Sequence, residues 1–140
     1  MSSLLDQFVS EAKGHLAEAG QGLLQLETSH SDPEALNSVF RAVHTLKGSA
    51  GMFDADALAR VLHATEECLE AGRNGELALD GAGVDALLAA LDQVQEWVDA
   101  LGGPGDLPAG ADEVAERVIA ALPDSGGSAT GEAAPAEASA

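Results

Sequence analysis

One segment of the chain, FRAVHTLKGSAG at 40–51, combines residue types that can carry chemistry. Steps of three and four residues from His44 reach Lys47, Gly48 and Gly51, so a helix through this segment places them together on one flank. The apolar residues of the same segment form a separate stripe beside that flank. We therefore expect the imidazole of His44 to face solvent.

The two glycines in this segment are costly, because glycine inside a helix is about 0.8–1 kcal/mol less favourable than alanine. Gly48 and Gly51 stand one and two turns after His44. We interpret their missing Cβ atoms as space through which a partner reaches the imidazole. The ammonium group of Lys47 would attract an anion delivered to the same place.

A neutral imidazole is a nucleophile for a phosphoryl group when one ring nitrogen is free and the other is held as a donor. Further along the chain, His63 and Glu66 are three residues apart and share one face of a helix. If Glu66 accepts the Nδ1–H of His44, it fixes the tautomer and enriches the electron density on Nε2. The residues thus predict phosphorylation of His44 at Nε2, oriented by Glu66, with Lys47 and His63 near the phosphate.

The strings HTLKGSAGMFD and HATEECLEAGRNGE, which begin at His44 and His63, resemble the phosphorylation-site motif of histidine-containing phosphotransfer (HPt) domains. The resemblance is to the N-terminal domains of CheA-type chemotaxis histidine kinases, and it covers about residues 4–101. In that family a phosphorylated histidine lies with a lysine three residues later and with a histidine and a glutamate on the following helix. His44, Lys47, His63 and Glu66 occupy these motif positions.

The resemblance implies a phosphorelay intermediate of two-component chemotaxis signalling. His44 would accept a phosphoryl group from ATP through the ATP-binding domain of a histidine kinase and donate it to the aspartate of a CheY-like response regulator. The fragment itself would bind no cofactor, would leave Mg²⁺ to the regulator and would not be an enzyme alone, although its parent chain would be a CheA-type kinase component. An apolar patch that includes Phe40 or Met52 would form the docking surface.

Five amphipathic segments position these residues, and their apolar positions recur at steps of three and four. They are 4–27, from Pro33 to about 51, about 55–72, from the residue after Asp80 to 101, and 112–122. Asp32 before Pro33 predicts an N-cap, and Asp54 or Asp56 is expected to cap the third segment. The pattern predicts an all-α fold, an antiparallel four-helix bundle with a short fifth helix.

The last part of the sequence has a different composition. Residues 123–140 contain only Pro, Asp, Ser, Gly, Ala, Thr and Glu, which offer too little apolar surface to offset the entropy of ordering. We expect a helical domain over 1–122 and a disordered linker over 123–140 that leads toward further domains.

The charge and the cysteine content of the chain argue against some partners and cellular locations. Six Lys and Arg against 24 Asp and Glu give a formal charge of −18, which disfavours nucleic acid and anionic lipid as partners. Cys68 is the only cysteine and lies on an apolar helix face, where we expect a small buried side chain. The absence of long apolar runs argues against membrane insertion, and together these features favour a cytoplasmic protein.

Two other functions fit the same residues. His44, His63 and Glu66 provide three potential ligands for zinc or iron in a metal-binding bundle, although di-iron bundles use Glu-x-x-His on two helices. A non-catalytic adaptor bundle is the other alternative, against which the presence of both His44 and Lys47 argues. His15 and His30 lack comparable neighbours and are expected to be surface residues.

Overall fold

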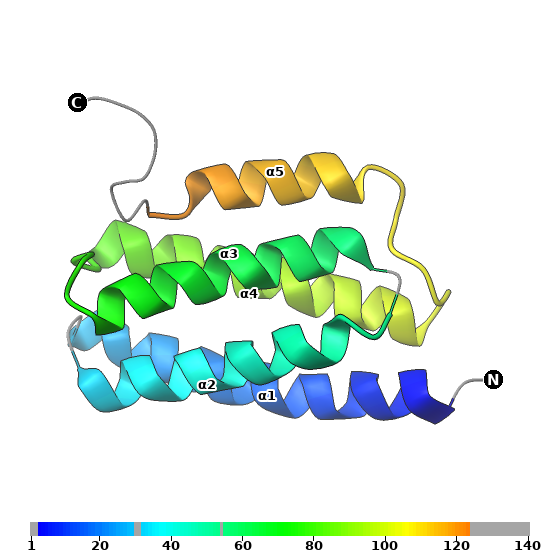
Figure 1. The fold of residues 1–140 in the computed structure, drawn as a ribbon, viewed down its shortest axis with the longest axis horizontal. Helices are drawn as coiled ribbons and strands as arrows, with labels where there is room; N and C mark the ends of the chain where they lie inside the picture. Colours follow the sequence, from blue (N-terminus) through cyan, green and yellow to red (C-terminus); the bar gives the residue numbers. More distant parts are fainter. Residues whose placement is uncertain (1–2, 30–31, 54, 124–140) are drawn as a thin grey trace.

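The computed structural model describes residues 3–29, 32–53 and 55–123, and five helices follow one another in this part of the chain. They are α1 (Ser3–Thr28), α2 (Pro33–Ala50), α3 (Asp56–Arg73), α4 (Gly81–Gly102) and α5 (Ala111–Ala121). The first four run antiparallel as a bundle, and α5 lies over α3 and α4 (Figure 1). The predicted all-α bundle with a short fifth helix is confirmed.

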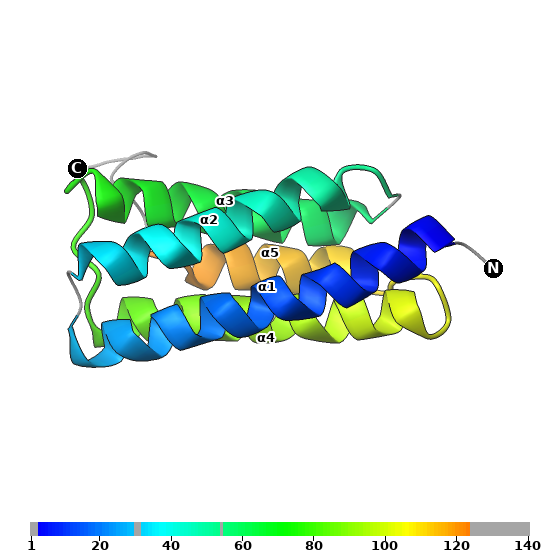
Figure 2. The same cartoon turned by 90° about the horizontal axis from the view of Figure 1, so that it is seen from below.

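Helix α2, which carries His44, packs against α1 on one side and α3 on the other. The view from below shows α1 and α2 lying along the bundle, with α5 on its far side (Figure 2). Helix α5 packs on α3 and α4, and across the described residues it makes no contact with α2. One side of α2 therefore faces solvent along its length.

The core consists of the apolar stripes that the periodicity predicts. On α2 the buried stripe includes Val39, Val43 and Leu46, which are at most 1% exposed. Trp97 of α4 is the largest of the fully buried side chains and is 1% exposed. Burial of side chains of this size contributes about 1.5–3 kcal/mol each. This burial fixes the rotation of α2 and turns the flank of His44 outward.

The predicted N-cap of α2 is confirmed, whereas that of α3 is wrong. The Asp32 side chain accepts hydrogen bonds from the backbone N–H groups of Glu34 (3.0 Å) and Ala35 (3.4 Å). Helix α3 instead has Ala55 at its N-cap without a side-chain hydrogen bond, and Asp56 is already its first helical residue. Asp54 lies outside the described residues.

Aromatic packing holds the turn between α2 and α3 where no side-chain cap does. The Phe53 ring lies 5.0 Å from the Phe8 ring of α1, centroid to centroid. The backbone N–H of Ala55 donates to the carbonyl oxygen of Phe53 at 2.9 Å. Aromatic pairs at this separation add about 0.5–1.5 kcal/mol beyond burial, enough to position a turn without a capping carboxylate.

The described chain ends at Pro123, one residue beyond the predicted domain boundary. A Cβ built on Gly83, near the start of α4, would lie 3.2 Å from the Pro123 ring, so this proline packs on the bundle. The rest of the predicted linker, 124–140, lies outside the described residues. Among the helices of the described chain, none is long and apolar enough to cross a membrane.

Replacing glycine with alanine is expected to have opposite effects on stability at two positions of α1. A Cβ on Gly22 would overlap the Val39 side chain and lie 3.3 Å from the Ala35 carbonyl oxygen, whereas a Cβ on Gly14 would meet nothing within 4 Å. We expect Gly22→Ala to lower the free energy of unfolding by about 1–3 kcal/mol through overpacking. Gly14→Ala should raise it by about 0.5–1 kcal/mol. Urea denaturation measures both, and changes of the same sign would contradict the packing described here.

Candidate functional site

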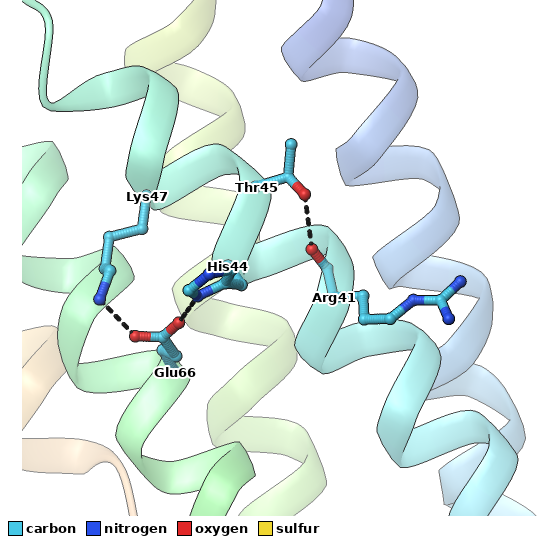
Figure 3. Close-up of polar contacts among 5 residues, drawn as sticks. All are labelled: Arg41, His44, Thr45, Lys47 and Glu66. Atoms are coloured by element: carbon cyan, nitrogen blue, oxygen red, sulfur yellow. Dashed lines mark hydrogen bonds and ion pairs between the residues drawn. The ribbon is translucent and has the colours of Figure 1, made fainter.

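A single carboxylate joins α3 to two functional side chains of α2. The Nδ1 atom of His44 is hydrogen-bonded to Oε2 of Glu66, and Nζ of Lys47 donates to Oε1 at 2.5 Å (Figure 3). The Glu66 side chain is only 9% exposed, whereas that of His44 is 64% exposed. The expected contact between Glu66 and Nδ1 is therefore present, and the imidazole faces solvent.

The environment of Glu66 keeps this carboxylate charged. Burial raises the pKa of Glu66, but the hydrogen bonds and charges of Lys47 and His44 lower it, and the net effect is a pKa below the ordinary value. An ionised carboxylate can only accept hydrogen bonds, so Nδ1 of His44 must carry the proton of their contact. In the neutral ring, Nε2 then keeps its lone pair, and this is the form of imidazole that acts as a nucleophile.

The structure places His63 away from this network. Its Nε2 atom lies 3.3 Å from Oε2 of Glu67, and among the contacts of the described residues it has none with His44. Helical geometry explains the difference, because His63 is turned about 60° from Glu66 around the α3 axis and lies closer to the direction of Glu67. His63 and Ile119 line a groove of about 400 Å³ between α3 and α5.

The position of His63 also bears on the metal-binding alternative, which needs His44, His63 and Glu66 to lie together. His44 and Glu66 are in contact, but His63 contacts Glu67 instead. Over 3–29, 32–53 and 55–123, no group of three His, Cys, Asp or Glu side chains is arranged to hold a metal ion. Burial raises the pKa of the Cys68 thiol to about 11, which fits the small buried side chain predicted for it.

The glycines beside His44 are exposed and leave open surface. A Cβ on Gly48 would meet nothing within 4 Å, and a Cβ on Gly51 would meet only carbonyl oxygens of its own helix, at 3.6 and 3.7 Å. Packing within the bundle therefore does not require a glycine at position 48. The Met52 side chain, at the end of the same flank, is 61% exposed.

Sequence reasoning missed an aromatic and cationic stack at the site. The Phe40 ring lies parallel to the His44 imidazole, with centroids 5.9 Å apart and planes 10° apart. The guanidinium carbon of Arg73, at the end of α3, lies 4.2 Å from the centroid of the Phe40 ring. The i, i+4 spacing of Phe40 and His44 is a signal for their contact. Nothing in the spacing indicates Arg73, because its approach depends on how α3 crosses α2.

Arg41 and Thr45 belong to α2 but not to this network. Oγ1 of Thr45 donates to the carbonyl oxygen of Arg41 at 2.9 Å, which is a bond within the helix. The Arg41 side chain points away from Glu66 (Figure 3). His15 is half-buried on α1, and His30 lies outside the described residues.

Comparisons with known proteins agree on one type of domain. The family model described as the Hpt domain matches residues 3–97. The chemotaxis protein CheA of Treponema pallidum is 33% identical over 123 residues, which cover 88% of this chain but only 15% of the relative. The CheA phosphotransferase domain from Thermotoga maritima superposes with a TM-score of 0.69 at 34% identity, covering 74% of this chain and 100% of that domain.

A more distant solved structure supports the fold. The phosphorylated P1 domain of CheA3 from R. sphaeroides, solved in complex with CheY6, has a TM-score of 0.75 at 21% identity. It covers 86% of this chain and 94% of that domain.

Because Lys47 and His44 share the Glu66 carboxylate, removing Lys47 should change the pKa of Glu66. We expect Lys47→Met to raise this pKa, because the variant loses a hydrogen bond and a positive charge while the effect of burial remains. Lys13→Met is the matched control, since it removes the same charge from an exposed pair with Asp99. Carboxyl ¹³C NMR of Glu66 during an acid titration measures the shift, and equal shifts in both variants would contradict the local origin of the lowered pKa.

The same pKa sets the direction of a stability change with pH. The pKa of Glu66 is lower in the folded than in the unfolded chain, so ionised Glu66 stabilises the fold. This stabilisation is fully present at pH values above 4.5, the ordinary pKa of the group. The stabilisation disappears as the pH falls through the folded pKa. Wild type should therefore exceed Lys47→Met in stability near neutral pH, and urea denaturation should show this difference shrinking in acid; a constant difference would argue against the linkage.

Proposed function

The chain belongs to the Hpt domain family, and we propose that it is the phosphotransfer domain of a CheA-type chemotaxis kinase, with His44 as the phosphoryl acceptor. The observation that carries the proposal is the contact of buried Glu66 with Nδ1 of an exposed histidine. This contact leaves Nε2 as the nucleophile on the solvent side. The chain spans 15% of the length of the Treponema relative. The proposed phosphoryl source is the ATP-binding domain of a histidine kinase, for which this domain is the substrate.

In the first transfer, the Nε2 lone pair attacks the γ-phosphorus of ATP held by a kinase domain. The N–P bond forms as the P–O bond to ADP breaks, and the imidazole, which keeps its Nδ1 proton, acquires a positive charge. The Glu66 carboxylate stabilises this charge through the hydrogen bond that it already makes. Lys47 is held one turn from His44 by the same carboxylate, where its ammonium attracts the phosphoryl oxygens.

In the second transfer, a carboxylate of a CheY-like response regulator attacks the phosphorus. The P–O bond to aspartate forms, the N–P bond breaks and its electron pair returns to Nε2, which restores the neutral imidazole. The complex of the R. sphaeroides P1 domain with CheY6 supports this choice of partner. We assign Mg²⁺ to the regulator, because the described residues of this chain offer no group of three ligands. Both transfers would take place in the cytoplasm.

The open surface beside His44 is the proposed approach for both partners. The absence of a Cβ at Gly48 costs helix stability, and no packing within the bundle explains it. A partner must bring its phosphorus atom within bonding distance of Nε2, so its backbone has to come close to α2. Gly48 and Gly51 permit that approach, and exposed Met52 offers apolar surface at the end of the same flank.

The acceptor assignment predicts where the phosphate is found. After incubation with ATP and a CheA-type kinase domain, we expect acid-labile, alkali-stable phosphate on the wild-type chain and on His63→Gln, but none on His44→Gln. His15→Gln controls for a histidine on another helix and should be labelled like the wild type. Radiolabelled ATP and mass spectrometry measure the label, and phosphate that persists in His44→Gln would refute the assignment.

If Gly48 leaves room for a partner to reach His44, replacing it with alanine should stabilise the fold but slow phosphoryl transfer. Gly48→Ala should raise the free energy of unfolding by about 0.5–1 kcal/mol. It should also slow both transfers by about tenfold, a barrier increase of about 1.4 kcal/mol. Gly14→Ala, whose Cβ also meets nothing within 4 Å, should gain similar stability at unchanged transfer rates. Rapid-quench kinetics measure the rates, and equal transfer by both variants would contradict the role in access.

A further inference from the structure

The hydrogen bond to Glu66 holds one atom of the His44 ring and leaves one motion of the ring weakly restrained. The hydrogen bond fixes the distance from Nδ1 to Oε2, but a combined rotation about the Cα–Cβ and Cβ–Cγ bonds can keep that distance and still tilt the ring plane. The Nε2 lone pair lies in that plane. A tilt therefore swings the lone pair away from the line of attack on phosphorus. The His44 side chain is 64% exposed, so few atoms of the bundle itself oppose the tilt.

The Phe40 ring is placed to restrain this motion. Its plane is within 10° of the imidazole plane, and the ring centroids are 5.9 Å apart, inside the range of offset aromatic stacking. The two residues are four apart on α2, so their Cβ atoms lie on the same face of the helix. Phe40 is half-buried and packs against the core, which makes it a firmer support than a solvent-exposed ring.

Arg73, on the neighbouring helix α3, packs on the Phe40 ring. Its guanidinium carbon lies 4.2 Å from the Phe40 centroid, a cation–π geometry. Arg73 is the last residue of α3, the helix that also supplies Glu66. Helix α3 therefore contacts the acceptor twice, directly through Glu66 at the ring edge and indirectly through Arg73 and Phe40 at the ring face.

We propose that Phe40 is a positioning residue that holds the plane of the His44 imidazole for phosphoryl transfer, and that Arg73 acts through Phe40. The inference rests on the proposed function for its consequence, since the rate that it affects is that of attack by Nε2. The geometric part is independent of that function, because the restraint on the ring exists without a phosphate donor.

The geometric part is tested by NMR relaxation of the His44 ring C–H groups in the full chain. We expect ring order to fall in Phe40→Leu, to fall by less in Arg73→Gln and to be retained in Phe40→Tyr, which keeps the aromatic face. Arg41→Gln removes the same charge from α2 without touching Phe40 and should leave the order unchanged. Unchanged order in Phe40→Leu would overturn the proposal.

The chemical part is tested with phosphoramidate, a small donor that needs no docking surface. The N–P bond to His44 forms as the P–N bond of phosphoramidate breaks and ammonia leaves. We expect Phe40→Leu to slow this reaction about tenfold and Arg73→Gln about threefold, while Phe40→Tyr and Arg41→Gln react like the wild type. Loss of ring order without a slower reaction would overturn the role in transfer. A wild-type chain that takes no phosphate from this donor or from the kinase would instead refute the proposed function.

Discussion

The Glu66 carboxylate is the interaction on which the site depends. It is buried between α2 and α3, its pKa is lowered by the two side chains that it binds, and it accepts one hydrogen bond from each. A buried carboxylate without partners would be costly, and here each oxygen has a donor on α2. The packing of two helices and the tautomer of one imidazole are thus set by the same group. His44, the proposed acceptor, is exposed, but the Glu66 carboxylate that binds its Nδ1 atom is part of the bundle interior.

The periodicity of apolar residues was enough to predict the helices, their order and the outward direction of His44. It succeeds because each stripe, such as Val39, Val43 and Leu46, must be buried against a neighbouring helix. The cap predicted at Asp56 is wrong because α3 has its N-cap one residue earlier, at Ala55. The Phe8–Phe53 contact beside that turn joins residues far apart in the sequence and leaves no local signal. The predicted linker covers 123–140, and its part over 124–140 lies outside the described residues and stays a prediction.

The site was predictable to the extent that it follows helical spacing. The contact of His44 with Glu66 requires that α2 and α3 be adjacent, which short connections favour, and that α3 turn Glu66 toward α2. The position of His63 depends on the rotation of α3, and a turn of about 60° moves it to Glu67 and the α5 groove. Arg73 was missed because its contact with Phe40 depends on the crossing of two helices. Local spacing therefore points to His44 as the candidate acceptor, and tertiary geometry selects its neighbours.

The most direct test of the account is the tautomer of His44 in the unmodified chain near neutral pH, read from long-range ¹H–¹⁵N NMR correlations. We expect a proton on Nδ1 and a bare Nε2 in the neutral ring, and we expect this preference to be lost in Glu66→Ala. A neutral ring with its proton on Nε2 in the wild type would contradict the central claim, because the nitrogen that faces solvent would then have no lone pair to offer.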